Sequence, residues 1–381
     1  MGEFSNDVFV FRSESYDVKI ITDGLRRAFE ALGVDLSALS DKNVVIKPNL
    51  VIRKTPDAAA TTHPAVIDAL LCLLGEAGIV PTIAESPGGV FSPSRLGASY
   101  RVCGIEEVAK NHGAVLNTDI TSEKMTFDGA KTLKVFDIIT PIAKADVIFD
   151  LCKLKSHSLT KMSAAAKNLY GTIPGITKFE LHAAHPDAKD FTSMLCDLSQ
   201  MLCTEKTVIA VTDAIIGMEG EGPTGGRPRK IGAVTVSKNP FAADYVSTKI
   251  LGMEGGVPLV EQAKERGLFD AEKINVLGDG INEIKVDGFV LPKSQNMPVL
   301  KFFSEGRMGK FFTPRPKITD KCRGCGECAA SCPQHTIKIV NKKAKINAKN
   351  CIKCYCCQEL CPFVAIKIKR NPIMVLISKL R

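Results

Sequence analysis

The chain has 381 residues, enough for two or three domains, and its contents of 45% hydrophobic and 24% charged residues are ordinary for a soluble globular protein. The N-terminus lacks a basic segment followed by an apolar stretch, and no apolar run approaches the roughly 20 residues that span a bilayer. We therefore expect a cytoplasmic protein without a secretory signal or a transmembrane segment. The net charge of +9 is uneven: residues 293–381 carry 19 Lys and Arg against 4 Asp and Glu, which leaves residues 1–292 at −6.

Residues 1–292 alternate short β-type runs with helical patterns, which is typical of an α/β body built on a parallel sheet. The predicted strands are Val8–Phe11, Val44–Lys47, Val80–Ala84, Asp146–Asp150 and Val208–Asp213. The predicted helices are Leu25–Leu32, Pro64–Ala77, Ile105–Asn111, Thr160–Leu169, Phe191–Leu202 and Pro240–Leu251. His63, directly before Pro64, is expected to cap the start of its helix.

Polar residues follow four of the predicted strands. They are Lys47, Asn49, Glu85, Ser86, Lys153, Lys155, His157 and Asp213. Because ligands of open α/β sheets bind outside the carboxyl ends of strands, these side chains are expected to converge on one site. Period-two alternation would place Lys153, Lys155 and His157 on the same side of an extended segment.

Further segments of the body could contact an anion. The glycine-rich loop of residues 217–227, which includes Thr224, Gly225 and Gly226, either wraps its N–H groups round a phosphate or carboxylate or is a flexible connection. Lys167 and Lys178 are additional candidate cations. His182 and His185 are spaced either as a metal pair or as surface or anion-contacting histidines.

Residues 293–317 break the α/β alternation with several prolines, phenylalanines and positive charges, and we interpret them as a basic linker. Residues 371–381 form a short apolar tail, either a docked helix or a weak contact with a membrane surface. The predicted domains are thus the body (1–292), the linker (293–317), a small α+β domain (318–370) and the tail (371–381).

The strongest signal is a repeated cysteine motif, C-x2-C-x2-C-x3-C-P, at residues 322–333 and 351–362. Nine of the 14 cysteines fall between residues 322 and 361, which argues against a disulfide framework and for a reducing compartment. In this motif three cysteines hold one [4Fe–4S] cluster and the fourth crosses to the other. One cluster is assigned to Cys322, Cys325, Cys328 and Cys361, and the second to Cys351, Cys354, Cys357 and Cys332. Cys356 is extra to the pattern and is expected to be a buried thiol.

This region resembles bacterial two-cluster ferredoxins at all eight ligand positions. A zinc ribbon is the alternative, but it needs two C-x2-C pairs and not two four-cysteine runs ending in Cys-Pro.

The body has its own resemblance. Its segments Lys47-Pro-Asn, Thr62-His-Pro, Lys153-x-Lys-x-His, Lys167-Asn-x2-Gly and Asp213-x10-Thr-Gly-Gly resemble the family called domain of unknown function 362, whose members often carry such a ferredoxin module. The run from Lys153 to His185 is also distantly similar to the lactate racemases. That likeness implies Lys167 as covalent anchor of a nickel-pincer nucleotide, His182 or His185 as nickel ligand and His157 as proton carrier, although the glycines that precede the lysine in racemases are replaced here.

Three functions remain open. In the first, an iron–sulfur redox enzyme binds an anionic substrate through Lys153, Lys155, Lys167 and Lys178, and His157 transfers a proton. In the second, the chain is an electron carrier whose basic tail steers an acidic ferredoxin or flavodoxin. The third is the racemase-like reaction. Nucleic-acid binding is not expected, because the basic tail contains no recognition motif.

Overall fold

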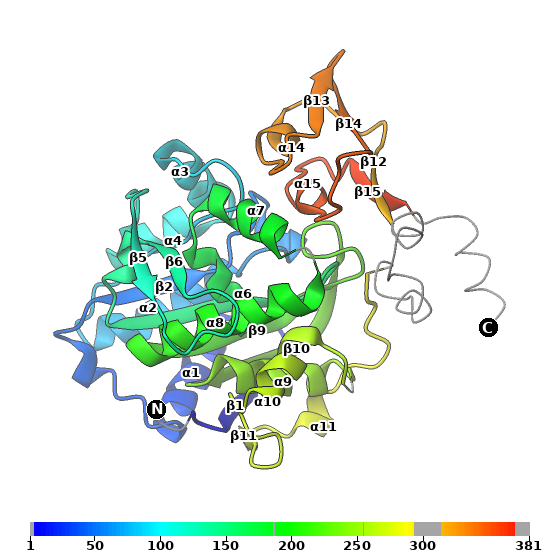
Figure 1. Cartoon of the computed structure of the whole chain (residues 1–381). Coiled ribbons are helices and arrows are strands. Elements are labelled where there is room, and N and C mark those ends of the chain that lie inside the picture. Colours follow the sequence, from blue (N-terminus) through cyan, green and yellow to red (C-terminus); the bar gives the residue numbers. More distant parts are fainter. Residues whose placement is uncertain (1–3, 186, 254, 293–313, 370–381) are drawn as a thin grey trace.

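The computed structural model describes residues 4–185, 187–253, 255–292 and 314–369. The predicted C-terminal tail and most of the predicted linker lie outside these residues, and the predicted domain boundaries stay predictions. The described residues form an α/β body and a small C-terminal domain (Figure 1).

The body is built on one nine-stranded sheet with the order β11–β1–β10–β9–β7–β2–β3–β4, and β8 pairs with β7. The strands are β1 (Asp7–Arg12), β2 (Val44–Pro48), β3 (Thr82–Ile83), β4 (Val115–Leu116), β7 (Val147–His157), β8 (Lys161–Ser163), β9 (Thr207–Glu219), β10 (Arg227–Ser237) and β11 (Asn275–Gly278). All five predicted strands are confirmed, as β1, β2, β3, β7 and β9. A separate hairpin joins β5 (Ser122–Thr126) to β6 (Val135–Ile139).

The sheet is mixed, because β10 is antiparallel to both β9 and β1 while the strands from β9 to β4 are parallel. The long β9–β10 hairpin is closed by the glycine-rich loop. The strand β10 is absent from the predicted elements because its first half, Arg227–Lys230, is charged and hides the apolar alternation that follows.

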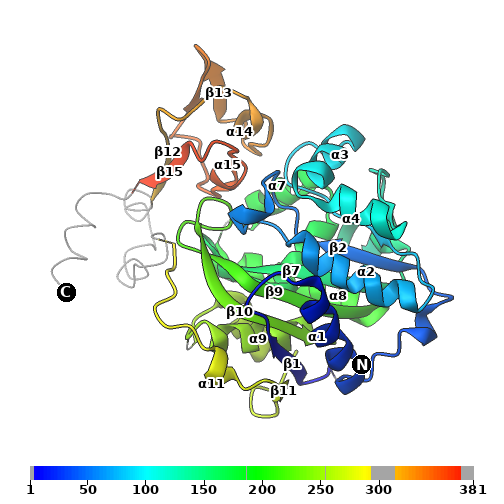
Figure 2. The same cartoon turned by 180° about the vertical axis from the view of Figure 1, so that it is seen from behind.

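Helices cover both faces of the sheet (Figures 1 and 2). One face packs on α1 (Val18–Ala31), α2 (Pro64–Glu76), α3 (Pro93–Val102) and α4 (Ile105–His112). The other packs on α5 (Thr140–Ala143), α6 (Ala165–Asn168), α8 (Ala188–Glu205), α9 (Pro240–Ile250), α10 (Pro258–Glu265) and α11 (Ile281–Ile284). Successive β7 residues alternate between the two cores, Ile148 on one side and Phe149 on the other, as a strand buried on both faces must.

The helices predicted to begin at Pro64, Ile105 and Pro240 begin there, whereas α1 and α8 begin before the predicted Leu25 and Phe191. His63 caps α2 as expected, since its Nδ1 accepts the N–H of Ala65 at 3.2 Å. The predicted helix Thr160–Leu169 is wrong in its first half. There the chain turns back with Lys161 at φ 65° and forms β8 against β7 before α6 begins. Pairing of this segment with β7 thus overrides the helical periodicity of its own sequence.

Short helices follow α6. The 3-10 turn η3 (Leu169–Thr172) leads into α7 (Gly175–Ala184), while η1 (Ser37–Leu39) and η2 (Pro56–Ala58) lie in earlier loops. The C-terminal domain contains two two-stranded sheets, β12–β15 and β13–β14, and two short helices. Its elements are β12 (Arg315–Ile318), α14 (Glu327–Ala330), β13 (Ile337–Val340), β14 (Lys343–Ile346), α15 (Cys356–Glu359) and β15 (Ile366–Lys369).

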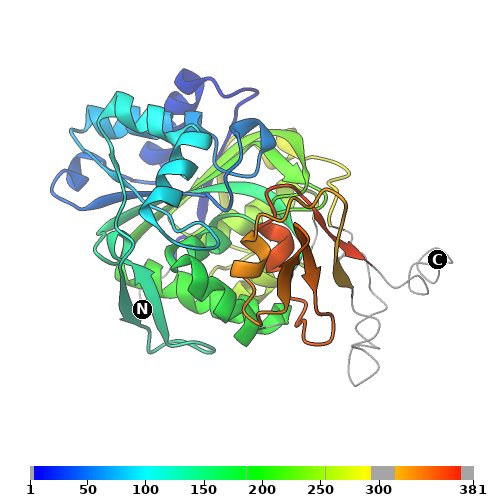
Figure 3. The ribbon, with the colours of Figure 1, turned by 90° about the horizontal axis from the view of Figure 1, so that it is seen from above.

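The C-terminal domain, orange and red in Figures 1 and 3, lies at one end of the body beside α7. Its contacts are with segments that follow the carboxyl ends of sheet strands. Gln358 approaches Ser158 after β7, Thr224 after β9 donates to the Glu359 carbonyl, and Arg95 after β3 pairs with Glu327. The domain therefore covers the edge where an α/β sheet binds ligands.

Candidate active site between the two domains

The first motif and the end of the second enclose a cavity of about 320 Å³ in the C-terminal domain. The cysteines that line it are Cys322, Cys325, Cys328 and Cys361. The N–H groups of Ala344 and Ala365 point at sulfurs of this set, at 3.3 Å from Cys322 Sγ and 3.2 Å from Cys361 Sγ. Such N–H groups stabilise the negative charge of a cluster's thiolates.

A second cavity of about 360 Å³ has the complementary set. Its cysteines are Cys332, Cys351, Cys354, Cys357 and the extra Cys356. The N–H of Thr336 points at Cys332 Sγ at 3.4 Å. Cys356 is 1% exposed and packs with Phe179 and Leu360, as a buried thiol does.

Each cavity brings together four of the eight motif cysteines, three from one motif and the fourth from the other. None of the 14 cysteines forms a disulfide. The residues of each cavity therefore fit an iron–sulfur cluster held by four thiolates.

A cavity with a polar lining, of about 620 Å³ including space open to solvent, lies between the strand ends of the body and α15. Polar residues that line it are Asn49, Glu85, Ser86, Lys155, Ser163, Lys167, Asn168, Tyr170, Lys178, His182 and Glu359. Its apolar wall consists of Val51, Phe179, Pro223 and Leu360. Because Glu359 and Leu360 follow the predicted ligand Cys357 by two and three residues, this cavity and the second cysteine cavity share one turn of the chain.

Three lysines line the cavity, and they differ in how they are held. Lys155 is 1% exposed, and its Nζ donates to Asn49 Oδ1 at 2.6 Å and to the Ala60 carbonyl at 2.7 Å. Lys178 Nζ donates to the Ser86 carbonyl, and burial lowers the Lys178 pKa to about 7. Within the described part of the chain, Lys167 Nζ makes no hydrogen bond and no ion pair, and burial lowers its pKa. Lys167 is therefore the cation of this cavity that is available to an anion.

Glu359 brings a carboxylate from the C-terminal domain to these cations. Burial raises its pKa, while Lys167 and Lys155 oppose that effect. Its Oε1 lies 3.3 Å from His157 Nε2, although the two atoms are not aligned for a hydrogen bond. His157 Nδ1 accepts the N–H groups of Leu159 and Thr160, so the ring proton is on Nε2 and faces Glu359. Burial lowers the His157 pKa well below its usual value, which keeps the ring neutral.

Two more polar atoms at the cavity are buried without a partner in the described residues, Ser86 Oγ and His182 Nδ1. The His182 ring stacks on Phe191 with centroids 4.1 Å apart, and burial lowers its pKa to about 3, so it is neutral. Unpaired buried polar atoms are rare in folded proteins and cost free energy unless a ligand or water satisfies them. Their position on the cavity wall indicates a place for a ligand.

The comparison with known proteins divides the chain in the same way as its architecture. The model of the family described as "Domain of unknown function (DUF362)" matches residues 44–249, more than half of the chain. The chain belongs to the DUF362 family. The model described as a 4Fe-4S dicluster domain matches residues 316–362, so this DUF362 protein contains an iron–sulfur domain.

Among curated proteins, the DUF362 chain is 30% identical over 297 residues to the thylakoid-associated protein sll1697 of Synechocystis sp., covering 75% of this chain and 88% of that protein. It is also 29% identical over 133 residues to the DNA-directed RNA polymerase subunit Rpo3 of Methanosarcina acetivorans, covering 34% of this chain and 43% of that subunit.

Among solved structures, lactate racemase apoprotein from Thermoanaerobacterium thermosaccharolyticum aligns with a TM-score of 0.37 at 15% identity, over 64% of this chain and 57% of the racemase. A protein from Thermotoga maritima aligns with a TM-score of 0.38 at 15% identity, over 62% of this chain and 58% of that chain.

Two residues predicted to bind the substrate of this DUF362 protein pair with each other instead of facing the cavity. Lys153 Nζ lies 2.6 Å from Asp213 Oδ2, and both side chains are 0% exposed. Lys153 also donates to Tyr16 Oη at 2.9 Å. Lys47 is likewise buried and paired, with Glu85, whose other contacts reach the cavity wall.

The predicted loop residues Thr224, Gly225 and Gly226 contact the C-terminal domain or the hairpin rather than the cavity. Thr224 Oγ1 donates to the Glu359 carbonyl at 2.8 Å, and Gly225 lies against Val364. Of this loop, only Pro223 lines the cavity. The glycine-rich loop thus contributes to the contact between the domains.

Besides Val51, Ser163, Tyr170 and Phe179 in the body, the sequence analysis missed two cavity residues of the C-terminal domain, Glu359 and Leu360. They occupy two of the three positions between Cys357 and Cys361 of the second motif, where nothing in the spacing marks a side chain as facing another domain. Only the docking of α15 on the body reveals them.

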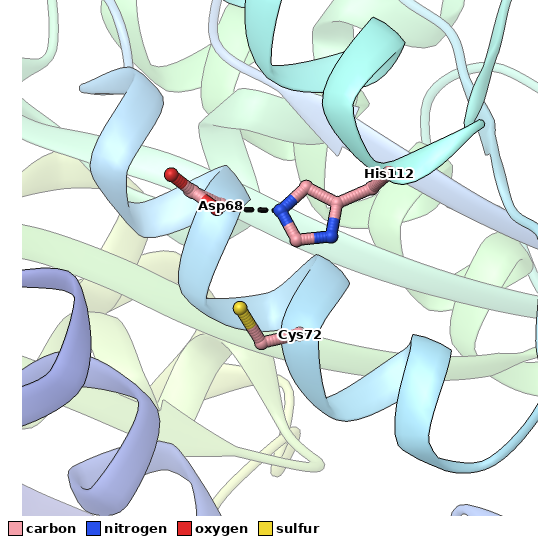
Figure 4. A group of neighbouring side chains, drawn as sticks. All are labelled: Asp68, Cys72 and His112. Atoms are coloured by element: carbon pink, nitrogen blue, oxygen red, sulfur yellow. Dashed lines mark hydrogen bonds and ion pairs between the residues drawn. The ribbon is translucent and has the colours of Figure 1, made fainter.

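One further group of potential metal donors lies outside this site. Asp68, Cys72 and His112 meet where α2 passes α4 (Figure 4), with Asp68 Oδ1 2.6 Å from His112 Nε2. Burial raises the Cys72 pKa, and the other two side chains satisfy each other. We assign this group to the contact between the two helices.

No helix in the described ranges combines the length and the apolar character required to cross a bilayer.

Proposed function

We propose that this protein is an iron–sulfur redox enzyme that acts on a small anionic substrate in the cavity between its domains. The observation that carries the proposal is the shared wall: α15 supplies Cys357 to one cavity, and Glu359 with the adjoining Leu360 to the other. Two [4Fe–4S] clusters, when bound by the eight cysteines, supply or accept electrons one at a time. Substrate and clusters would then be separated by little more than one helical turn of protein.

Lys167 is proposed to bind the anionic group. Its ammonium is free of hydrogen bonds and ion pairs in the described residues, and it lies on the short helix α6, whose first N–H groups are fixed by Asp244 at 2.7 and 3.2 Å. A cation held on a fixed backbone loses little freedom when it binds an anion.

His157 is proposed to help deliver the proton that accompanies a change of charge on the substrate. Its Nε2–H faces Glu359, and the glutamate carboxyl group in turn lines the cavity. The Glu359 carboxylate would take a proton from solvent and pass it to the substrate, while the neutral His157 ring holds that carboxyl group in position without changing its own protonation state.

The test uses the intact protein, reduced anaerobically and mixed with a panel of small organic anions while the absorbance of its clusters is followed. One class of anion is expected to reoxidise the wild type. Lys167→Met should lose this reaction, and His157→Phe should slow it by about two orders of magnitude, the usual contribution of a positioned acid or base. The matched control is Lys189→Met, which removes an exposed lysine of α8. Unchanged reoxidation in both Lys167→Met and His157→Phe would contradict the proposal.

A dedicated electron carrier is the second candidate, and one observation favours it. A groove of about 580 Å³ beside Cys351 is lined by Arg315, Lys317, Lys353 and Lys369. Such a basic rim would attract an acidic ferredoxin or flavodoxin at a rate that falls with ionic strength. A carrier would transfer electrons to such a partner equally well in Lys167→Met, and no small anion would reoxidise it.

A further inference from the structure

The cavity between the domains contains a carboxylate that belongs to the protein itself. Glu359 extends from α15 into a cavity whose other walls come from the body, and it lies among Lys155, Lys167 and His157. The backbone of Glu359 is fixed by Thr224, whose hydroxyl donates to its carbonyl at 2.8 Å. The body therefore receives this carboxylate through a defined contact.

The balance of charge leaves room for another anion. Lys155, Lys167 and Lys178 line the cavity. Glu85, the other acidic residue in the wall, is already paired with the buried Lys47. Glu359 interacts electrostatically with Lys167 and Lys155, but among the described residues it is within ion-pair distance of neither. A second carboxylate would find a cation that Glu359 does not hold.

The uncharged part of the cavity wall indicates which chemical group carries the anionic group of the ligand. Phe179 packs on Cys356 and Leu360, and this apolar surface faces the cavity. Ser86 Oγ and His182 Nδ1, which are buried and unpaired, offer one or two polar contacts beside it. A carboxylate on a compact apolar body matches these three features, whereas a phosphate ester would require more donors than are unpaired here.

We infer that the substrate class is a small monocarboxylate with an apolar body, whose carboxylate pairs with Lys167 beside the side chain of Glu359. This inference rests on the proposed function for the meaning of "substrate", but the binding itself does not depend on turnover. It makes Glu359 a like charge next to the bound anion, which weakens the binding of that anion.

Binding can be measured by anaerobic calorimetry on the intact protein with three probes: benzoate, its uncharged analogue benzamide, and inorganic phosphate. Benzoate is expected to bind the wild type and benzamide to bind more weakly or not at all. Glu359→Gln keeps the shape of the side chain but removes its charge, so benzoate should bind about tenfold more tightly because a like charge is gone from a partly buried site. Lys167→Met should abolish the preference for benzoate over benzamide.

Arg95→Met is the matched control that shows whether a weaker contact between the two domains is enough to change the affinity for benzoate. Arg95 makes a two-pronged ion pair with Glu327 at 2.8 and 3.0 Å, a contact between the same two domains that does not line this cavity. Its affinity for benzoate should equal that of the wild type. Because Glu359 neighbours cluster ligands, iron content is measured for each variant, and Glu359→Asp provides a second variant in which a shorter carboxylate should give an intermediate affinity.

Several outcomes would overturn the inference: benzoate affinity in Glu359→Gln equal to or below that of the wild type, an equal increase in Arg95→Met, or binding of phosphate without benzoate. The proposed function fails separately, if benzoate-type anions bind as expected but no anion reoxidises the reduced protein. Conversely, reoxidation could depend on Lys167 while Glu359→Gln binds benzoate with unchanged affinity. That result would contradict this inference and would still support the proposed redox function.

Discussion

The buried pair of Lys153 and Asp213 provides a quantitative test of which polar residues hold the fold and which serve the site. We predict that Lys153→Met destabilises the body strongly but leaves benzoate binding and reoxidation by anions unchanged. The Nζ–Oδ2 distance is 2.6 Å and both side chains are 0% exposed. At an effective dielectric constant of about 20, this distance corresponds to an attraction of about 6 kcal/mol, part of which is offset by the desolvation of the two charges.

The net loss in Lys153→Met is smaller than this attraction because Asp213 keeps other partners. Tyr16 Oη donates to it at 3.0 Å and the N–H groups of His63 and Ile215 at 3.0 and 3.3 Å. We therefore expect a loss of about 3 kcal/mol, at the lower end of the range for a buried charge left without its partner. Urea denaturation followed by circular dichroism measures this loss, and the double variant with Asp213→Asn should lose less than the sum of the two single variants.

Two results would refute this reasoning. A loss below about 1 kcal/mol would show that the pair does not hold the sheet. A fold of normal stability that no longer binds anions would show that Lys153 faces the substrate after all.

Three further predictions follow from the same geometry. Cys356→Ser should retain about eight irons per chain and Cys357→Ser should lose about half of them, because only the latter is assigned as a ligand, and iron and sulfide analysis decides between them. Lys178→Met should stabilise the protein most near pH 6, and this gain should shrink between about pH 7 and pH 10. The reason is that the folded Lys178 pKa of about 7 lies below the pKa of lysine in the unfolded chain, so the stability of the wild type rises with pH over this range. Denaturation midpoints at several pH values measure the difference in stability between variant and wild type. Gly222→Ala should lower the melting temperature, because an added Cβ would overlap the Ser156 carbonyl. In Gly220→Ala the added Cβ has open space around it, so that this variant should show only the smaller cost of backbone strain at φ 83°. Equal shifts of the melting temperature in the two variants would contradict the assigned overlap.

The cysteine region is where the sequence was most informative, because ligand geometry is local. Three cysteines at intervals of three form one side of a cavity wherever the rest of the chain lies. In the structure the eight cysteines fall into the two sets that this spacing predicts. The α/β class could be predicted because its signal is also local: strands buried on both faces, such as β2 and β7, are short apolar runs bounded by turns.

The residues of the site could be predicted from the sequence only in part. Lys155, Lys167 and Lys178 do line the cavity, but the sequence could not distinguish them from Lys153, which lies two residues from Lys155 on the same strand. That difference arises because Asp213 stands opposite Lys153 on β9, and the strand register becomes irregular between Lys153 and Lys155. Likewise, Glu359 is separated from His157 by about two hundred residues, and no local pattern connects them.

The docking of α15 on the body has a consequence for when this protein can work in a cell. Because the last turn of that helix closes the binding cavity, and because small metal-binding domains generally acquire their structure together with their metal, a chain made during iron starvation would have a finished sheet but an open, incomplete pocket. Under the function proposed above, recognition of the substrate would then depend on iron supply, so that protein molecules unable to complete the reaction would also not bind its substrate.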